Sequence, residues 1–176
     1  MALLKIARMG NPVLLARAEA VPDPAAPGVR QLIDDMIETM EDARGAGLAA
    51  PQVHVGQRIF IYRVPEERST GADDPPLPVQ ALINPQIIPV GDEMTLRLEG
   101  CLSIPGLRAA VPRHARVRYE GIDRDGRAVS GEAVGFLAMV LQHENDHLDG
   151  ILYPMRMTDL TRFGFEDEVM RYGMPT

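Results

Sequence analysis

The chain has 176 residues, a formal net charge of −7 and a hydrophobic fraction of 45%. This length predicts a single catalytic domain over 1–176 with a real hydrophobic core. The acidic balance argues against a general nucleic-acid binder. No apolar run reaches the ~18 residues that span a membrane, and the first residues lack a secretory signal pattern, so we expect a cytoplasmic protein without a membrane partner. The single cysteine, Cys101, excludes an internal disulfide.

The first half of the chain predicts one helix followed by short strands. Apolar residues with helical spacing indicate an amphipathic helix within 29–40, which Arg44 and Gly45 are expected to end. Residues 65–78 are expected to form a polar, Pro-rich surface loop. Strand-like segments with turn-forming residues between them lie at 58–64, 79–83, 86–90, 94–98, 115–122 and 127–133. Asp125-Gly126 separates the last two and predicts a hairpin.

The second half predicts another helix. The arginines of 108–118 alternate with apolar residues, which favours a strand with one solvated face. Apolar residues then recur with helical spacing over 134–148, and a short helix is expected within 159–171. This order of elements predicts an α+β domain, in which mainly antiparallel short strands pack around a central C-terminal helix.

The helix expected over 134–148 carries His143-Glu144-x-x-His147. Residues four apart on a helix share one face, so both imidazoles can reach one metal ion. Glu144 lies beside them and is suited to move the proton of a water. The alternative is a buried helix with two satisfied histidines, but burying Glu144 with them would be costly without partners. The motif therefore predicts a metal-dependent hydrolase.

A catalytic metal site needs three protein ligands and one open position, and the residues leave the third ligand open. The longer metalloprotease pattern requires a histidine at position 153, where this chain has Tyr153. Glu166 follows at a plausible distance, although no clear helical pattern surrounds it. Cys101 offers a thiolate, a strong ligand for transition metals, and Gly100 before it permits close approach of the backbone.

A run of small residues at 45–52, Gly-Ala-Gly-Leu-Ala-Ala-Pro-Gln, is the third notable cluster. It lacks the Gly-Lys-Ser/Thr ending of a phosphate-binding loop. A helix end and turn would explain Gly45 but not the whole run. Small residues would let an extended substrate lie close to the backbone, and the Gln52 amide could donate to a developing oxyanion.

Together these segments resemble the peptide deformylase family. Its motif Gly-x-Gly-Leu-Ala-Ala-x-Gln matches at 45–52, Glu-Gly-Cys-x-Ser at 99–103, and Gln-His-Glu-x-Asp-His-Leu-x-Gly at 142–150, in the family's order. The resemblance implies a hydrolase of a linear amide C–N bond. It would remove the N-formyl group from the N-terminal formyl-methionine of newly synthesised polypeptides and release formate. A metal-bound water would attack the formyl carbon, with Glu144 as general base and then general acid.

The resemblance also implies the roles of individual residues. Cys101, His143 and His147 would bind the metal, typically Fe²⁺, with Zn²⁺, Ni²⁺ or Co²⁺ as substitutes. The Gln52 side chain and the Leu102 backbone N–H would hold the oxyanion. The implied substrate-binding positions are Gly45, Ala46, Gly47, Glu99, Gly100, Arg108, Phe136, Met139 and Val140.

The implied partners are N-formylmethionyl nascent peptides and, transiently, the ribosome, with no specific nucleic acid. Some relatives contact the ribosome through a longer, basic C-terminal helix. This sequence instead carries Glu166-Asp167-Glu168 and a short tail, so contact through that element is not expected. Two alternatives remain open: an internal metallopeptidase that uses Glu166 as its third ligand, and a catalytically silent paralogue that binds formylated or unmodified N-termini.

Overall fold

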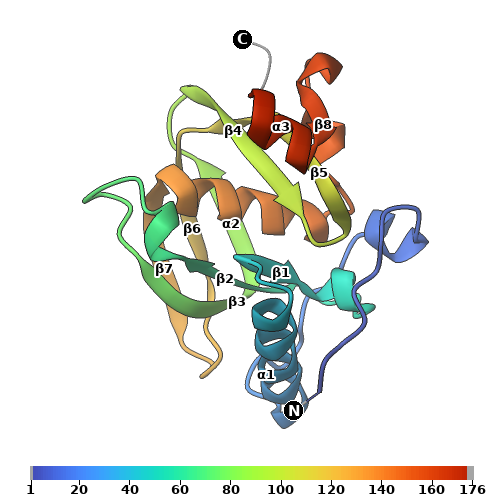
Figure 1. The fold of residues 1–176 in the computed structure, drawn as a ribbon. Helices are drawn as coiled ribbons and strands as arrows, with labels where there is room; N and C mark the ends of the chain where they lie inside the picture. Colours follow the sequence, from blue (N-terminus) through green and yellow to red (C-terminus); the bar gives the residue numbers. More distant parts are fainter. Residues whose placement is uncertain (1, 174–176) are drawn as a thin grey trace.

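The computed structural model describes residues 2–173, which form two antiparallel sheets and three α-helices (Figure 1). The larger sheet has the strand order β1 (Gly47–Ala49), β2 (Ile59–Val64), β3 (Leu77–Pro89), β6 (Arg116–Ile122) and β7 (Ala128–Val134). The smaller has the order β4 (Met94–Cys101), β5 (Ile104–His114) and β8 (Phe163–Phe165). The helices are α1 (Pro27–Asp42), α2 (Gly135–Leu148) and α3 (Glu166–Tyr172). The predicted α+β class with antiparallel strands is confirmed.

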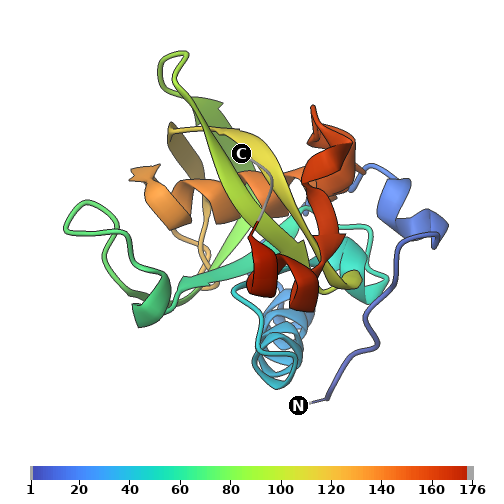
Figure 2. The same ribbon diagram turned by 45° about the horizontal axis from the view of Figure 1, so that its top comes forward.

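The larger sheet carries a helix on each face, and strand β2 shows why. Ile59 and Ile61 pack in a core cluster with the apolar residues of α1, whereas Phe60 and Tyr62 pack in the cluster that contains α2. Successive side chains of a strand point to opposite faces, so a continuous apolar run is buried on both sides. Figure 2 shows α1 and α2 on opposite sides of this sheet.

Helix α2 lies between the two sheets (Figure 1). Its apolar side chains Ala138, Val140 and Leu141 belong to the core cluster of the larger sheet. Its polar side faces the smaller sheet, where His143 contacts β4 and Asp146 contacts β5.

No helix within residues 2–173 is long and apolar enough to cross a bilayer.

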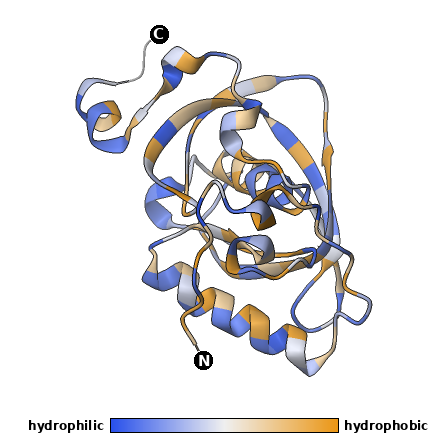
Figure 3. Cartoon of the chain, turned by 90° about the vertical axis from the view of Figure 1, so that its right-hand side faces the viewer, coloured by the Kyte–Doolittle hydropathy of each residue, from blue (hydrophilic) through white to orange (hydrophobic). Residues whose placement is uncertain are grey.

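Helix α1 ends differently from the prediction. Blue and orange residues alternate along α1 in Figure 3, as its amphipathic pattern requires. However, the left-handed residue at its end is Arg44, with φ of 54°, rather than Gly45. The N–H of Gly45 donates to the Met40 carbonyl at 2.8 Å, and that of Arg44 to Glu41 at 3.0 Å, which is a Schellman end. Gly45 packs closely against the Leu102 side chain, since a Cβ there would lie 2.9 Å from it.

The expected surface loop at 65–78 contains one buried residue, Asp74, which the prediction missed. Its carboxylate accepts hydrogen bonds from the backbone N–H groups of Phe136 at 2.7 Å and Leu137 at 3.1 Å, in the first turn of α2. It also accepts from the Thr70 hydroxyl at 2.7 Å. Asp74 therefore caps the N-terminus of α2 although it lies 62 residues earlier in the chain than Phe136. The helix dipole favours a negative charge at this end.

Replacing Asp74 with Ala is expected to lower the free energy of unfolding by about 2 kcal/mol, because the buried N–H donors of α2 lose a charged acceptor. Urea unfolding of the purified chain measures the loss. The matched control is Asp73→Ala, since Asp73 is exposed and adjacent in sequence. Equal stability of the two variants would contradict the capping role.

Two predicted strand boundaries are wrong. The segments 79–83 and 86–90 form one strand, β3, with an irregularity between Ile83 and Gln86. Asn84 adopts φ of 51° there, and its amide pairs with the backbone of Val21. The arginine-rich stretch 108–118 is not one strand with a solvated face. It is split between β5 and β6, and its Arg113 is buried.

Candidate metal centre and active site

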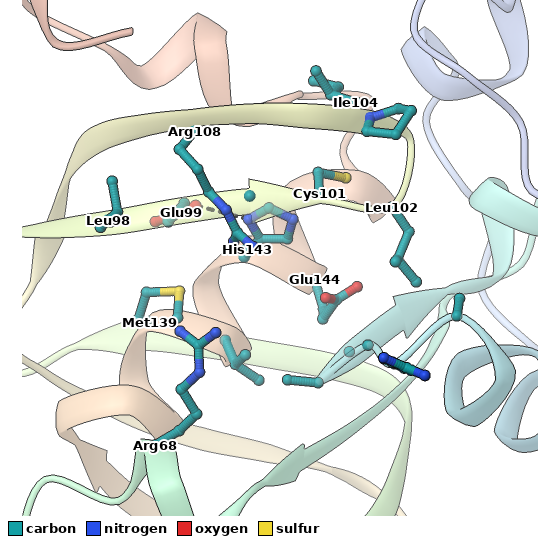
Figure 4. A pocket seen from close by; sticks show the side chains of 18 of the residues that line it. Arg68, Leu98, Glu99, Cys101, Leu102, Ile104, Arg108, Met139, His143 and Glu144 are labelled. Atoms are coloured by element: carbon teal, nitrogen blue, oxygen red, sulfur yellow. Dashed lines mark hydrogen bonds and ion pairs between the residues drawn. The ribbon is translucent and has the colours of Figure 1, made fainter. Parts of the chain in front are cut away.

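A cavity of about 690 Å³ opens where β1, the end of β4 and α2 meet (Figure 4). Five separate parts of the chain supply its lining, four of them within 43–52, 63–68, 98–108 and 136–144, and the fifth being Glu166. All the predicted site residues except His147 line it: Gly45, Ala46, Gly47, Gln52, Glu99, Gly100, Cys101, Leu102, Arg108, Phe136, Met139, Val140, His143 and Glu144. His147 lies behind the lining, with its Nε2 3.3 Å from the Cys101 sulfur. The fold thus brings the three sequence motifs to one place.

Cys101, His143 and His147 offer ligand atoms that all lie within 4.8 Å of one another. Cys101 ends β4, and the two histidines occupy successive turns of α2, with ring centroids 5.0 Å apart. One thiolate and two imidazoles suit Fe²⁺, Zn²⁺, Ni²⁺ and Co²⁺, and three protein ligands leave a position open for chemistry. The donor set therefore fits a catalytic divalent metal.

The residues at the two other positions considered for the third ligand have other partners. The Tyr153 ring stacks on His143 with centroids 6.1 Å apart, as a packing partner of the ligand. Glu166 accepts hydrogen bonds from Arg108. Glu166 begins α3, which overlaps the short helix expected within 159–171. Among the residues that the structure describes, only Cys101 joins the two histidines in a group of this kind.

A buried ion-pair network orients His143. Its Nδ1 lies 2.7 Å from the Glu99 carboxylate, an arrangement that fixes the ring and directs Nε2 toward the other ligands. Arg113 donates to Glu99 at 2.6 Å and 3.0 Å and to Asp146 at 2.6 Å, and Arg156 also donates to Asp146. Burial acts to raise the pKa of Glu99, but the hydrogen bonds from Arg113 and His143 outweigh it and lower that pKa. Glu99 is thus held as a carboxylate behind the ligand.

His147 has no comparable partner behind it. Its Nδ1 is buried and makes no hydrogen bond within the described part of the chain. Burial, followed by the nearby charges of His143 and Arg113, lowers the pKa of His147 well below its usual value. The ring is therefore neutral, which is the form that binds a metal.

Glu144 is a buried residue of the cavity lining. Its Oε2 has no hydrogen-bond partner among residues 2–173, and burial raises the pKa of Glu144 to about 7. Gly47 lies directly against this side chain, because a Cβ there would sit only 2.2 Å from Oε1 of Glu144. A glycine at 47 is therefore required for Glu144 to occupy this position in the cavity lining.

The Gln52 amide is oriented by its surroundings. Its Oε1 accepts from the Ala49 N–H at 2.8 Å, so its NH₂ group points into the site, where it donates to the Ser103 hydroxyl at 3.0 Å and contacts the Cys101 sulfur at 3.5 Å. Leu102 lies in the turn between β4 and β5, and its N–H has no acceptor in the structure of residues 2–173. The site therefore holds two N–H donors beside the candidate metal ligands.

Sequence reasoning missed the residues that support the site from a distance. Arg113 was expected on a solvated face, yet its partners lie 14 and 33 residues away in the chain. No local pattern marks such a residue. Ser103, which holds the Gln52 amide, was the last residue of the Glu-Gly-Cys-x-Ser motif, and that position was the signal for it.

Comparisons with known proteins show the family of the chain. The sequence model of the polypeptide deformylase family matches residues 3–163. A relative named peptide deformylase 2, from Ralstonia nicotianae, is 49% identical over 162 residues, which cover 92% of this chain and 91% of the relative. The crystal structure of peptide deformylase from Ehrlichia chaffeensis in complex with actinonin has a TM-score of 0.83 and 35% identity, with 92% of each chain covered. The Met-Ala-Ser-bound class I type b peptide deformylase from Acinetobacter baumannii has a TM-score of 0.80 and 35% identity, with 88% of this chain and 98% of that chain covered. With a match of this extent and relatives of this similarity, the chain belongs to the polypeptide deformylase family.

Proposed function

We propose that Cys101, His143 and His147 hold one divalent metal ion and that Glu144 moves the protons of a hydrolysis beside it. The reaction is the one that defines the family, removal of the N-formyl group from newly synthesised polypeptides with release of formate. The observation that carries the proposal is the Glu144 carboxyl, which is buried, has an oxygen without a hydrogen-bond partner among the described residues and lines the same cavity as Cys101 and His143 of the Cys-His-His group.

The metal would be Fe²⁺, with Zn²⁺, Ni²⁺ or Co²⁺ able to use the same ligands. When bound, it supplies a Lewis acid that polarises the formyl carbonyl and acidifies a water molecule. Glu144 accepts a proton as this water adds to the formyl carbon. It then returns a proton to the amine nitrogen as the C–N bond breaks, which leaves formate and a free N-terminal amine.

Two donors stabilise the negative charge that develops on the formyl oxygen. The Gln52 NH₂ group is held by Ala49 and Ser103 in the direction of Cys101, and the Leu102 N–H is free to donate. Preorganised donors of this kind need no reorientation during the reaction, which is why they lower the barrier.

The substrate would lie along β1. This strand is at the edge of the larger sheet, so its outer backbone groups can pair with an extended peptide, as in β-augmentation. Phe136, Met139 and Val140 of α2 supply an apolar pocket for the first side chain. The Met-Ala-Ser peptide bound by the Acinetobacter baumannii relative begins with methionine, which supports an N-terminal methionine in this pocket.

The cellular setting follows from this substrate. Nascent polypeptides arise in the cytoplasm, so we propose that the protein acts there. Helix α3 begins with three acidic residues, Glu166, Asp167 and Glu168, and like charge disfavours contact with RNA phosphates. A transient ribosome contact would therefore use another surface.

The test is formate release from formyl-Met-Ala-Ser by protein purified anaerobically and loaded with Fe²⁺. Acetyl-Met-Ala-Ser is the matched control, because its methyl group adds bulk and makes the carbonyl less electrophilic. We expect rapid release of formate and much slower release of acetate. Peptide binding without turnover would identify a catalytically silent paralogue instead.

Replacing Cys101 with Ala is expected to reduce metal content from about one ion per chain to nearly none, because two histidines alone do not make a stable site. Metal analysis after gel filtration measures this. Glu166→Ala is the control and should retain the metal, since Glu166 pairs with Arg108. The internal metallopeptidase hypothesis requires the opposite result for the two variants.

A further inference from the structure

The C-terminal segment 163–172 contributes one residue, Glu166, to the cavity lining. Strand β8 pairs with β5 so that Gly164 lies opposite Arg108. Val169 of α3 is buried, and its side chain comes within 3.1 Å of the position of a Cβ on Gly164. Figure 2 shows α3 beside β5, and the first residue of α3, Glu166, belongs to the cavity lining. The segment is therefore attached to the site by strand pairing and by packing.

An ion pair between Glu166 of this segment and Arg108 of β5 lies in the cavity lining. Arg108 donates from Nε to Glu166 Oε1 at 3.0 Å, and its Nη2 donates to the same oxygen. The remaining nitrogen, Nη1, lies over Gly100, where a Cβ would be only 2.3 Å away. Glu166 therefore holds the Nε and Nη2 side of the guanidinium. The Nη1 side faces the end of β4, where Gly100 precedes Cys101. In Figure 4 Arg108 extends from β5 toward Glu99 and His143.

We propose that Glu166 is a positioning residue for substrate binding, which holds Arg108 so that its Nη1 can donate to a carbonyl oxygen of the peptide. A free arginine side chain samples many rotamers and loses that freedom on binding, whereas a fixed guanidinium has already been ordered. The C-terminal segment thereby tunes the affinity for substrate without touching the reacting atoms. This inference rests on the proposed function.

The test measures kcat and KM for formate release from formyl-Met-Ala-Ser. Glu166→Ala should raise KM about two- to fivefold, the range that a partly exposed ion pair supports, and leave kcat within about twofold. Glu166→Gln should recover part of the loss, because its amide oxygen still accepts a hydrogen bond. An unchanged KM in Glu166→Ala, with formate still released, overturns the inference alone. Absence of formate release by the unmodified protein overturns the proposed function instead.

A double variant shows whether Glu166 acts through Arg108. If it does, Arg108→Gln with Glu166→Ala should have the same KM as Arg108→Gln alone, because the guanidinium is already lost. A further rise in KM would mean that Glu166 contacts the peptide itself, which contradicts a positioning role.

The matched control is the Arg162–Asp159 pair in the preceding turn. Its side chains are 25% and 47% exposed, against 25% and 45% for Arg108 and Glu166, but it does not line the cavity. Arg162→Ala should leave KM unchanged. If it raises KM as much as Glu166→Ala does, the effect comes from general loosening of the segment, and the positioning role is excluded.

Discussion

Replacing Glu144 with Gln is expected to lower kcat by about 10²- to 10⁴-fold, while the metal and the peptide still bind. The amide has the same size as the carboxyl group and fits opposite Gly47, so the packing of the cavity is retained. It cannot accept a proton from the attacking water, and its NH₂ group cannot serve as the acid for the departing amine. The variant therefore removes the proton transfer and little else.

Three measurements check this result: formate release, metal content and the affinity for Met-Ala-Ser. Glu132→Gln is the control, because Glu132 is an exposed carboxylate on β7 that pairs with Arg116, away from the cavity. Wild-type turnover by Glu144→Gln would rule out its role in proton transfer. Loss of the metal together with activity would show that Glu144 supports the site mechanically instead.

Replacing Arg113 with Met is expected to lower the free energy of unfolding by about 3–5 kcal/mol, the largest stability loss predicted for this chain. Arg113 is 4% exposed and lies between the carboxylates of Glu99 and Asp146, both also buried. Without it, the buried Glu99 loses its only arginine partner among the described residues, and the buried Asp146 keeps only Arg156. A methionine fills the volume but cannot offset the cost of desolvating the two charges.

The same variant should weaken metal affinity about 10- to 100-fold, because Glu99 orients the ligand His143 and is itself held by Arg113. Urea unfolding of the metal-free chain gives the stability, and competition with a chelator gives the affinity. Arg116→Met is the matched control on the next strand, since the Arg116–Glu132 pair is more than half exposed. That pair should contribute about 1 kcal/mol or less. Equal losses in the two variants would show that the Arg113 network is no more important than a surface pair.

The local sequence pattern was sufficient to predict elements whose structure depends on residues close by in the sequence. The helical spacing of apolar residues located α1 and α2, and Asp125-Gly126 located the turn between β6 and β7. The local sequence pattern gave wrong predictions where the structure depends on a contact with a residue far away in the sequence. Asn84-Pro85 looked like a strand break, but the Asn84 amide binds the Val21 backbone and one bulged strand continues through it. Arg113 looked solvated because its acidic partners are remote in sequence.

The sequence by itself determined that His143 and His147 share a helix face, because a spacing of four residues does so in any helix. It also supplied the motifs by which the chain resembles its family. Only the tertiary structure decided that Cys101, and not Glu166, offers a ligand atom beside that pair, since these distances depend on how the sheets pack around α2. It likewise decided that Asp74 and Arg113 support the site, because burial and long-range pairing arise only when the whole chain is folded.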